Sequence, residues 1–258
     1  IIDHGFVPKG SFAAALFGWI ESFINKSADT IITSSTFAAD ELVKSWGVSE
    51  ASVTAVTDGV NTDEFLPYEK AVARKKLNLP DVPVAAFLGL FNRYQGVDLL
   101  LEVISLLKKR GSRIHFLLMG FPDGKYRERA AAEGIDDMIT FTGKVDYTQA
   151  PLYLSAADVA LSPKISLTEA NGKLFNYMAC GLPSLVFETP VNREILGDTG
   201  TYASFADPLD FADMLAALLA DAARCAELGR LSRNKALEEH SWASRGEVLF
   251  QLYQRILQ

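Results

Sequence analysis

Beyond residue 83 the sequence alternates short, continuously apolar runs with helical segments, and this alternation limits the possible folds more than any other feature. The apolar runs predict strands at residues 84–89, 114–120, 138–141, 158–163 and 184–187. Strands that are apolar on both faces must be covered on both faces, and helices between them make parallel βαβ connections. The sequence therefore predicts an α/β fold built on a Rossmann-like parallel sheet.

The residues on either side of this alternation have a different character. An amphipathic helix at residues 11–25, followed by two short strands around a second helix, is predicted near the start. A stretch with three prolines and many charges separates these elements from the sheet and is interpreted as a linker with one short helix. The expected organisation is a partial first domain at 1–58, the linker at 59–83, the sheet domain at 84–240 and a C-terminal helix at 241–258.

Composition excludes several classes of protein. Apolar residues make up 49% of the 258 residues, which excludes disorder as the main state. The 25 basic and 32 acidic residues give a net charge of −7, the wrong sign for a protein that binds nucleic acid by its field alone. No apolar run reaches the ~18–20 residues of a membrane span. Two cysteines cannot form a disulfide framework, so we expect a cytoplasmic protein, with a peripheral position at the inner membrane face as the second option.

Metal chemistry is not expected from this sequence. Its three histidines are scattered, and no Asp-x-Asp triplet occurs. An anionic ligand would then have to be held by a few cations and backbone amides.

The turn after the first strand of the sheet domain is the first candidate for such a role. Ligands of parallel sheets bind at the carboxyl ends of the strands. This turn runs from Gly89 to Gly96, carries Arg93 as its one cation and leads into a helix, whose N-terminus suits phosphate. An ordinary βα turn with an exposed arginine is the alternative. The turn lacks the GxGxxG fingerprint, which disfavours a nicotinamide dehydrogenase.

Residues 158–187 contain the second candidate. A strand ends at Pro163, and a helix is predicted to start near Gly172 and Lys173. A lysine in the first turn of a helix opposes the macrodipole, which makes sense where an anion is bound. The loop before this helix carries the polar residues Lys164, Thr168, Glu169 and Asn171. A solvated lysine is the alternative, but the polar loop beside it favours a ligand.

Several segments together resemble the family 4 glycosyltransferases. They are TIITSS after Ala28-Asp29, DGVNTDEF at 58–65, the two-glycine turn, and KLFNYMACGLPSLV at 173–186. The last segment is the most specific, because it resembles the family pattern K-L-x-E-Y-M-A-x-G-x-P-x-V. The resemblance runs along nearly the whole chain.

This resemblance implies a retaining enzyme of the GT-B fold that uses a nucleoside-diphosphate sugar. In that fold two Rossmann-like domains face each other across a cleft, and the C-terminal one holds the donor. Two such domains need ~300–400 residues, so we expect residues 1–58 to be the last part of the acceptor-side domain of a truncated chain. The implied partners are the donor and an acceptor that is a glycan, a lipid or a small molecule. Neither a metal nor another cofactor is implied.

The resemblance also implies site residues. His4 matches a histidine near the transferred sugar, although a core histidine beside a strand end is the alternative, and Glu169 is the second catalytic candidate. The expected donor-binding residues are Gly89, Arg93, Gln95, Gly96, Val145, Lys164, Asn171, Gly172, Lys173, Leu174 and Asn176. Amides at 172–174 are expected to stabilise the departing diphosphate, and the backbone near 143–145 to contact the base.

The chain departs from the family pattern at the residues that carry charge. The family turn reads G-R-x-x-x-x-K-G, and Leu90 and Gln95 stand at its two cationic positions. Losing two charged hydrogen bonds without replacement costs about 3–6 kcal/mol. Arg93 and Lys173 are the candidates to restore this charge.

The family's pair of glutamates, eight residues apart, is also altered. By register the two positions are Thr168 and Asn176, with Glu169 one residue from the first. An asparagine can still bond a ribose hydroxyl, but without the charge of a carboxylate.

These departures leave two rival functions beside a glycosyltransferase. A non-catalytic GT-B relative that acts as a binding or scaffold module is favoured by the lost charges and disfavoured by the retained Gly89, Gly96, Lys173 and Gly181. Another GT-B enzyme, such as a nucleotide-sugar epimerase, would need a cluster of carboxylates and histidines that the sequence lacks. We therefore expect a glycosyltransferase with a variant donor site.

Overall fold

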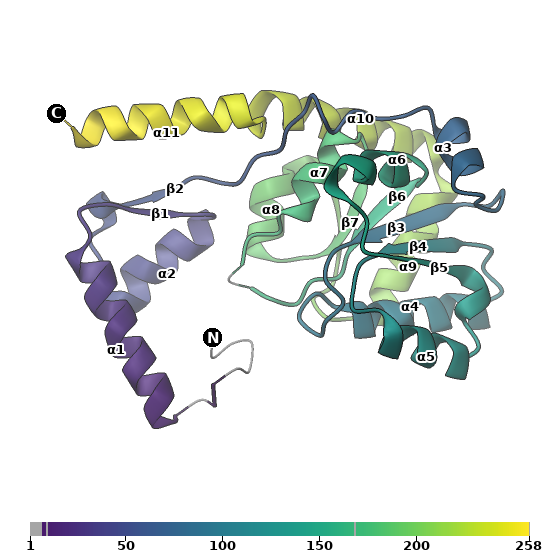
Figure 1. Cartoon of the computed structure of the whole chain (residues 1–258), viewed down its shortest axis with the longest axis horizontal. Helices are drawn as coiled ribbons and strands as arrows, with labels where there is room; N and C mark the ends of the chain where they lie inside the picture. The colour runs from purple at the N-terminus through teal and green to yellow at the C-terminus, as the bar shows by residue number, and fades with distance from the viewer. Residues whose placement is uncertain (1–6, 9, 168, 258) are drawn as a thin grey trace.

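A parallel six-stranded sheet is the centre of the computed structural model, which describes residues 7–8, 10–167 and 169–257 (Figure 1). Its strands are β3 (Val84–Leu88), β4 (His115–Met119), β5 (Ile139–Gly143), β6 (Val159–Ser162), β7 (Ser184–Phe187) and β8 (Gly200–Ala203). They lie in the order β5-β4-β3-β6-β7-β8, and every pairing is parallel. The order changes direction between β3 and β6, so the ligand position expected of such a sheet lies between their carboxyl ends.

The structure confirms the predicted α/β fold and adds one strand. The five predicted strands are present, with bounds that differ by no more than two residues. The sixth, β8, was missed because its four residues, GTYA, contain a glycine and form no continuous apolar run. It pairs with β7 at the edge of the sheet.

Seven helices among the described residues cover both faces of the sheet. They are α4 (Val97–Lys109), α5 (Gly124–Ala132), α6 (Ala150–Ser155), α7 (Lys173–Ala179), α8 (Pro190–Leu196), α9 (Pro208–Ala220) and α10 (Ala222–Glu239). Because neighbouring side chains of a strand point to opposite faces, Ala85 and Phe87 of β3 pack in the core with α4 and α9. Val84 and Ala86 pack in the second core, with α7 and α8.

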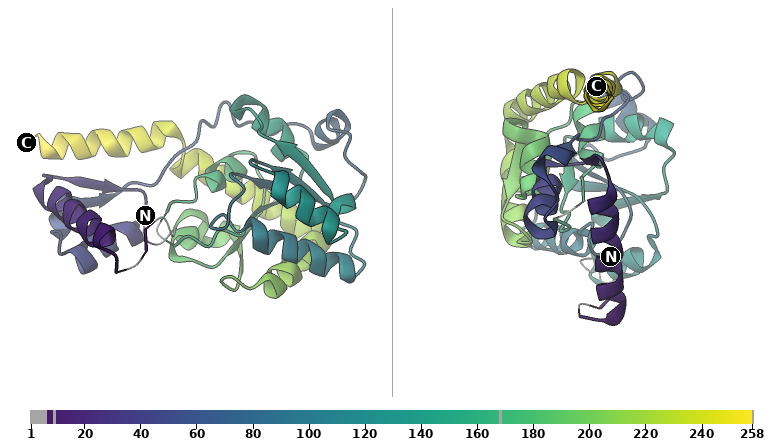
Figure 2. Two further views of the ribbon diagram at one scale, coloured as in Figure 1. Left: turned by 60° about the horizontal axis from the view of Figure 1, so that its bottom comes forward. Right: turned by 90° about the vertical axis from the view of Figure 1, so that its left-hand side faces the viewer.

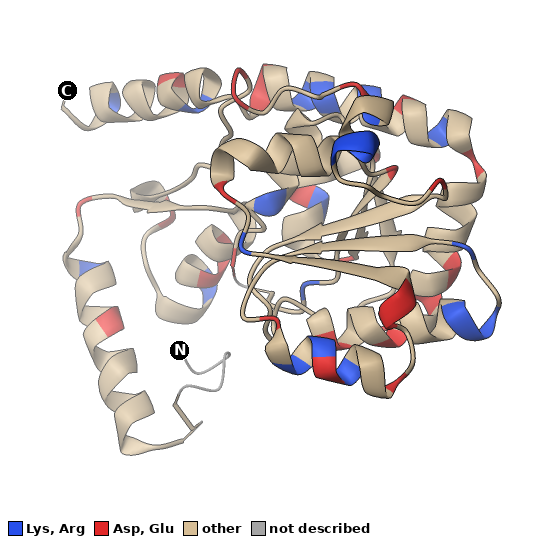
Figure 3. Ribbon diagram, turned by 45° about the vertical axis from the view of Figure 1, so that its right-hand side comes forward, with Lys and Arg blue, Asp and Glu red and all other residues tan. Residues whose placement is uncertain are grey.

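A smaller part of the molecule, shown from two further sides in Figure 2, lies beside the sheet. It consists of α1 (Phe12–Ser27), β1 (Ile31–Thr33), α2 (Thr36–Trp46) and β2 (Val53–Ala55), and β1 pairs with β2 in parallel. Ala14 is the one buried residue of α1, and most of this helix is free of charge in Figure 3. No helix in the described ranges is both long and apolar enough to span a bilayer.

Short helical turns and two connecting helices complete the described chain. The 3-10 turns are Glu50–Ser52, Asp136–Met138, Tyr147–Gln149 and Gly197–Thr199, and the connecting helices are α3 (Lys70–Lys76) and α11 (Trp242–Ile256).

The chain crosses from the smaller part to the sheet near Val60 and crosses back near Ser241, and these two crossings lie side by side. Val60 and Ser241 form an isolated parallel bridge there, and the Val60 N–H donates to the carbonyl of His240 at 2.8 Å. A Cβ on Gly59 would lie 3.0 Å from that same carbonyl oxygen, so the two crossings are packed closely. The His240 ring is buried against Phe175 of α7, with 4.9 Å between ring centroids.

Candidate functional site

The turn between β3 and α4 depends on two glycines for its shape. Gly96 has a φ of +76°, and a Cβ there would lie 1.7 Å from the carbonyl oxygen of Pro163. A Cβ on Gly89 would lie 3.1 Å from the ammonium of Lys173. Any larger residue at either position would therefore push the turn away from the loop after β6 or displace the lysine.

The turn and the loop after β6 are held together as one unit. The Ile165 N–H donates to the carbonyl of Tyr94 at 2.9 Å, and the Gln95 N–H donates to the side chain of Asn92 at 2.9 Å. The two segments meet at the carboxyl ends of β3 and β6, where the order of the sheet changes direction. The predicted residues Gly89, Gln95, Gly96 and Lys173 are thus brought to one place.

Lys173 is the central cation of this place. Its ammonium donates to Oε1 of Gln95 at 2.5 Å and lies 4.4 Å from the centroid of the Phe87 ring. Burial, together with the nearby charge of Lys164, lowers the pKa of Lys173 to about 7. In the described part of the chain no carboxylate pairs with this ammonium. Its protonated form is therefore a half-buried cation held by neutral groups, which is the state that an anionic ligand would stabilise.

Lys164, which is expected to contact the donor, is engaged within its own loop. Its side chain is buried, and its ammonium donates to the carbonyl of Ala170 at 2.7 Å and lies 3.1 Å from the carboxylate of Glu169. Burial lowers the pKa of Lys164, while the bond to Glu169 opposes that change. The lysine is thus occupied within its own loop, where it holds Glu169 at the surface of the site.

Asn171 and Leu174 are also engaged by the protein itself. The amide of Asn171 is buried and donates to Ser162 at 3.0 Å and to Asn192 at 2.9 Å. The Leu174 N–H donates to the Asn171 carbonyl at 2.9 Å. These polar groups fix the start of α7, and the expected contact of both residues with the donor stays a prediction.

The remaining predicted residues have varied positions. Arg93 is exposed at the tip of the turn, Gly172 is exposed at the start of α7 and Asn176 is half-buried one helical turn further on. Val145 packs against the second core, after β5. His4 and Thr168 lie outside the described residues.

Sequence reasoning missed three contributors. Phe87 was assigned to the core as a strand residue, yet its ring also faces the Lys173 ammonium. Tyr177 accepts the Leu88 N–H at 2.8 Å and donates to the Leu161 carbonyl at 3.1 Å, so it joins β3 to β6 beneath the site. The Asp58 carboxylate lies near Gly172, 4.0 Å from where a Cβ would be. Tyr177 and Asp58 had a sequence signal, their places in the KLFNYM and DGVNTDEF segments, whereas Phe87 had none.

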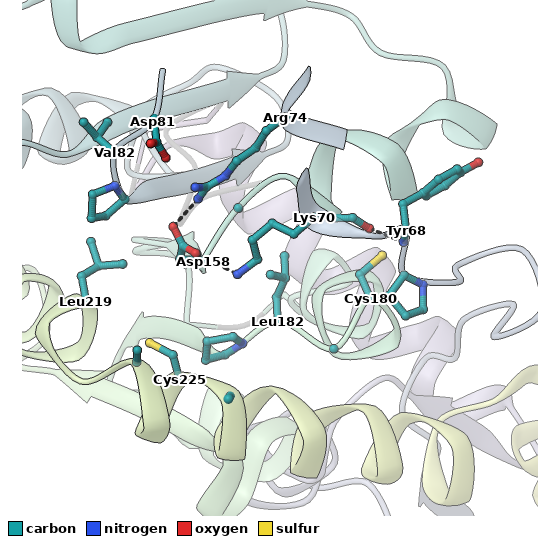
Figure 4. A pocket seen from close by; sticks show the side chains of 18 residues that line it. Tyr68, Lys70, Arg74, Asp81, Val82, Asp158, Cys180, Leu182, Leu219 and Cys225 are labelled. Atoms are coloured by element: carbon teal, nitrogen blue, oxygen red, sulfur yellow. Dashed lines mark hydrogen bonds and ion pairs between the residues drawn. The ribbon is translucent and has the colours of Figure 1, made fainter. Parts of the chain in front are cut away.

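A separate cavity lies at the amino ends of the strands. It measures about 540 Å³ and is lined by Lys70, Arg74 and Asp158 together with apolar residues (Figure 4). No predicted site residue lines it. Among the described residues no group of three or more His, Cys, Asp or Glu is placed to hold a metal ion.

Comparison with protein families gives one match that covers much of the chain. Residues 82–221 match the family described as "Glycosyl transferases group 1". These 140 residues are just over half of the 258 and include the whole sheet, both loops and α7.

Curated proteins with similar sequences are named as glycosyltransferases. The chain is 28% identical over 253 residues to D-inositol 3-phosphate glycosyltransferase 2 of Catenulispora acidiphila, covering 92% of this chain and 58% of that protein. It is also 28% identical over 243 residues to the GDP-mannose-dependent alpha-(1-6)-phosphatidylinositol monomannoside mannosyltransferase of Mycolicibacterium smegmatis, covering 89% and 63%. The chain thus spans about three-fifths of the length of these relatives.

Solved structures share the fold over nearly the whole chain. Sucrose-phosphate synthase from Thermosynechococcus elongatus superposes with a TM-score of 0.82 at 25% identity, over 96% of this chain and 64% of that one. HepE from Anabaena in complex with UDP superposes with a TM-score of 0.84 at 11% identity, over 97% and 70%.

Proposed function

The chain belongs to the group 1 glycosyl transferases, and from this premise we propose that it transfers a sugar from a nucleoside-diphosphate sugar to an acceptor with retention of configuration. The observation that carries the proposal is the Lys173 ammonium, held between Gln95 and Phe87 where β3 and β6 diverge. The relatives are named as transferases, so a non-catalytic role is not favoured.

The donor class is supported by the charge at this place and by the names of similar proteins. One relative is named as GDP-mannose-dependent, and one solved structure with this fold contains UDP. A diphosphate beside Lys173 would receive a charged hydrogen bond, which contributes about 1.5–3 kcal/mol. Arg93 supplies a second cation from the exposed tip of the same turn.

The chemical role of these cations would be electrostatic. As the bond between the sugar and the diphosphate breaks, negative charge accumulates on the departing diphosphate, and fixed cations near it lower the energy of that state. Gly89 and Gly96 let the backbone of the turn approach the ligand closely. The donor phosphate itself would help to deprotonate the acceptor.

Three further roles complete the proposal. Asn176 would bond a hydroxyl of the donor ribose, and Glu169 would face the transferred sugar from the loop that Lys164 holds. The backbone after β5, near Gly143 and Val145, would contact the base. His4 would lie near the transferred sugar.

Isothermal titration calorimetry with UDP and GDP tests the donor site. We expect Lys173→Ala and Arg93→Ala each to weaken binding about tenfold or more, which corresponds to ~1.4 kcal/mol per decade. The matched control is Arg113→Ala, because Arg113 is an exposed arginine just before β4, at the opposite edge of the sheet. Unchanged affinity in both site variants would refute this phosphate site, and a wild-type protein that binds no nucleoside diphosphate would refute the donor class.

Retention needs a separate measurement. The anomeric configuration of the product, determined by NMR from a donor that the protein accepts, should match that of the donor. Inversion would contradict the proposed mechanism while leaving the donor site intact.

A further inference from the structure

The cavity at the amino ends of the strands is well separated from the candidate donor site, since the two lie at opposite edges of one sheet. Its walls come from the linker and α3, the segments just before β3, β6 and β7, and the junction of α9 with α10 (Figure 4). Its volume of about 540 Å³ falls within the range of about 300–1,000 Å³ that is typical of small-molecule sites.

In the polar part of the cavity two cations contact the carboxylate of Asp158, and the exposed carboxylate of Asp81 also lines the cavity. Asp158 accepts from the Lys70 ammonium at 2.8 Å, from Nη2 of Arg74 at 2.5 Å and from the Val84 N–H at 2.8 Å. Burial opposes ionisation of Asp158, but these donors outweigh it and hold the pKa of the carboxyl below its usual value. Asp158 is therefore ionised at neutral pH, and one of the two positive charges is left uncompensated by it.

The two cations also keep donors for a further partner. Arg74 uses Nε on the carbonyl of Ala156 and Nη2 on Asp158, and in the described structure Nη1 has no acceptor. Lys70 is half exposed and uses one of its three N–H donors on Asp158. Both side chains point into the space in Figure 4.

Most of the remaining lining residues are apolar, and three of them are prolines. They include Pro67, Pro83, Leu182, Pro183, Leu219 and Ala226. Proline rings have no side-chain freedom to lose, so a flat apolar group can pack on them at low entropic cost. Asp81 lines the cavity as an exposed carboxylate, which disfavours a ligand with a second negative charge.

We propose that this cavity binds a small organic monoanion, an aromatic or aliphatic carboxylate whose charge lies on Lys70 and Arg74 and whose apolar body lies on the prolines and leucines. The N–H donors that Lys70 and Arg74 keep select an anionic group, the nearby Asp81 disfavours a second negative charge, and the apolar lining selects an apolar body. This site is independent of the donor site.

A matched pair of probes tests both parts of the proposal on the whole chain. 2-Naphthoate carries the carboxylate, and 2-naphthylmethanol has nearly the same shape without charge. In ligand-observed NMR titrations we expect saturable binding of 2-naphthoate and binding of the alcohol that is at least tenfold weaker. Lys70→Met, which keeps the stem and removes the charge, should weaken 2-naphthoate at least tenfold, and Lys76→Met, at an exposed lysine of the same helix outside the cavity, should leave it unchanged.

The Cys225 thiol reports the position of the bound probe. It lines the cavity, is half-buried and donates to the Leu218 carbonyl. Saturating 2-naphthoate should slow alkylation of Cys225 by iodoacetamide, measured by mass spectrometry, at least threefold in the wild type and little in Lys70→Met. Excess UDP should leave that protection in place.

Three results would overturn the proposal: equal affinity for 2-naphthoate and 2-naphthylmethanol, unchanged affinity of Lys70→Met for 2-naphthoate, or a rate of Cys225 alkylation that 2-naphthoate does not change. The first result is measured on the wild-type protein, and the second on a variant at an exposed position. Neither result therefore depends on a variant that fails to fold. Displacement of 2-naphthoate by UDP would place the probe in the donor site instead.

Discussion

The two edges of the central sheet, at the amino ends and at the carboxyl ends of its strands, each place two cations beside an ion-paired carboxylate. At the carboxyl edge Lys164 pairs with Glu169, and the charge of Lys164 acts on the nearby Lys173. At the amino edge Lys70 and Arg74 both pair with Asp158. The two edges therefore differ in how the carboxylate is shared between the cations.

The two arrangements differ in whether their charges contribute to stability or to binding. Asp158 is contacted by both cations and by a backbone N–H, so its charge ties α3 to the start of the sheet. Glu169 pairs with Lys164, and Lys173 is left with the amide of Gln95 and the ring of Phe87. At the amino edge, the Asp158 carboxylate shared by both cations therefore stabilises the fold. At the carboxyl edge Glu169 pairs with Lys164, so that among the described residues Lys173 is left as a cation for a ligand.

The largest effect on stability should come from crowding the backbone at the carboxyl edge. Gly96→Ala puts a Cβ on the Pro163 carbonyl at a φ of +76°, and we expect a loss of about 3–5 kcal/mol in the free energy of unfolding. Gly111→Ala is the control, because Gly111 has a φ of +72° but nothing within 4 Å, and should cost about 1 kcal/mol. Equal losses in urea titrations would show that crowding by Pro163 is unimportant.

Removing the shared carboxylate should affect stability at the amino edge. Asp158→Ala leaves two cations and the Val84 N–H without their acceptor, and we expect a loss of about 2–4 kcal/mol in urea unfolding. Asp213→Ala, which breaks an exposed pair with Arg110, should cost less than about 1 kcal/mol. Affinity for UDP should be unchanged in both variants. A stable Asp158→Ala protein would contradict the division between the edges.

Neutralising Lys173 should weaken the binding of UDP and leave stability nearly unchanged, the opposite of what we expect for Asp158→Ala. Lys173→Met keeps the stem over Phe87 and removes a cation that has no carboxylate partner, so the free energy of unfolding should change by less than about 1 kcal/mol. Affinity for UDP should fall about tenfold, or ~1.4 kcal/mol, in calorimetry. A variant that loses stability but keeps its affinity would assign Lys173 to the fold rather than to the ligand.

The smallest effect concerns pH. Because the pKa of Lys173 is lowered to about 7 and a bound diphosphate favours the charged form, affinity for UDP should rise as pH falls from 8 to 6.5. The charged fraction grows from about one-tenth to about three-quarters over this interval, so we expect a several-fold increase. Lys173→Met should remove most of the dependence, and a wild-type affinity that is flat across this range would contradict the role of this ammonium.

Backbone requirements of the site were predictable from the sequence, whereas side-chain directions were not. Gly89 and Gly96 were identified because a tight turn before a helix needs them, and both have positive φ. Asn171 and Lys164 were expected to face a ligand because they are polar residues of a loop. Asn171 instead bonds Asn192, 21 residues away, a contact that only the packing of α8 against α7 creates.

The same reasoning explains the missed residues of the fold and site. Phe87 fits a buried strand residue in every respect, and its second contact, with Lys173, depends on how α7 is placed. The sequence of β8 has only a weak strand pattern, and β8 forms a strand by pairing with β7. Periodicity thus identifies elements, and the contacts between distant elements decide what their side chains do.

The paired crossings at Val60 and Ser241 would act as a pivot for any movement of the smaller part. A swing of the smaller part about this pivot would carry α2 past α8, and the bonds from Thr36 to the Glu194 carboxylate, 2.8–2.9 Å long, would be among the first to stretch. Since His240 adjoins the pivot and also touches Phe175, the helix that begins with Lys173 is mechanically connected to that swing.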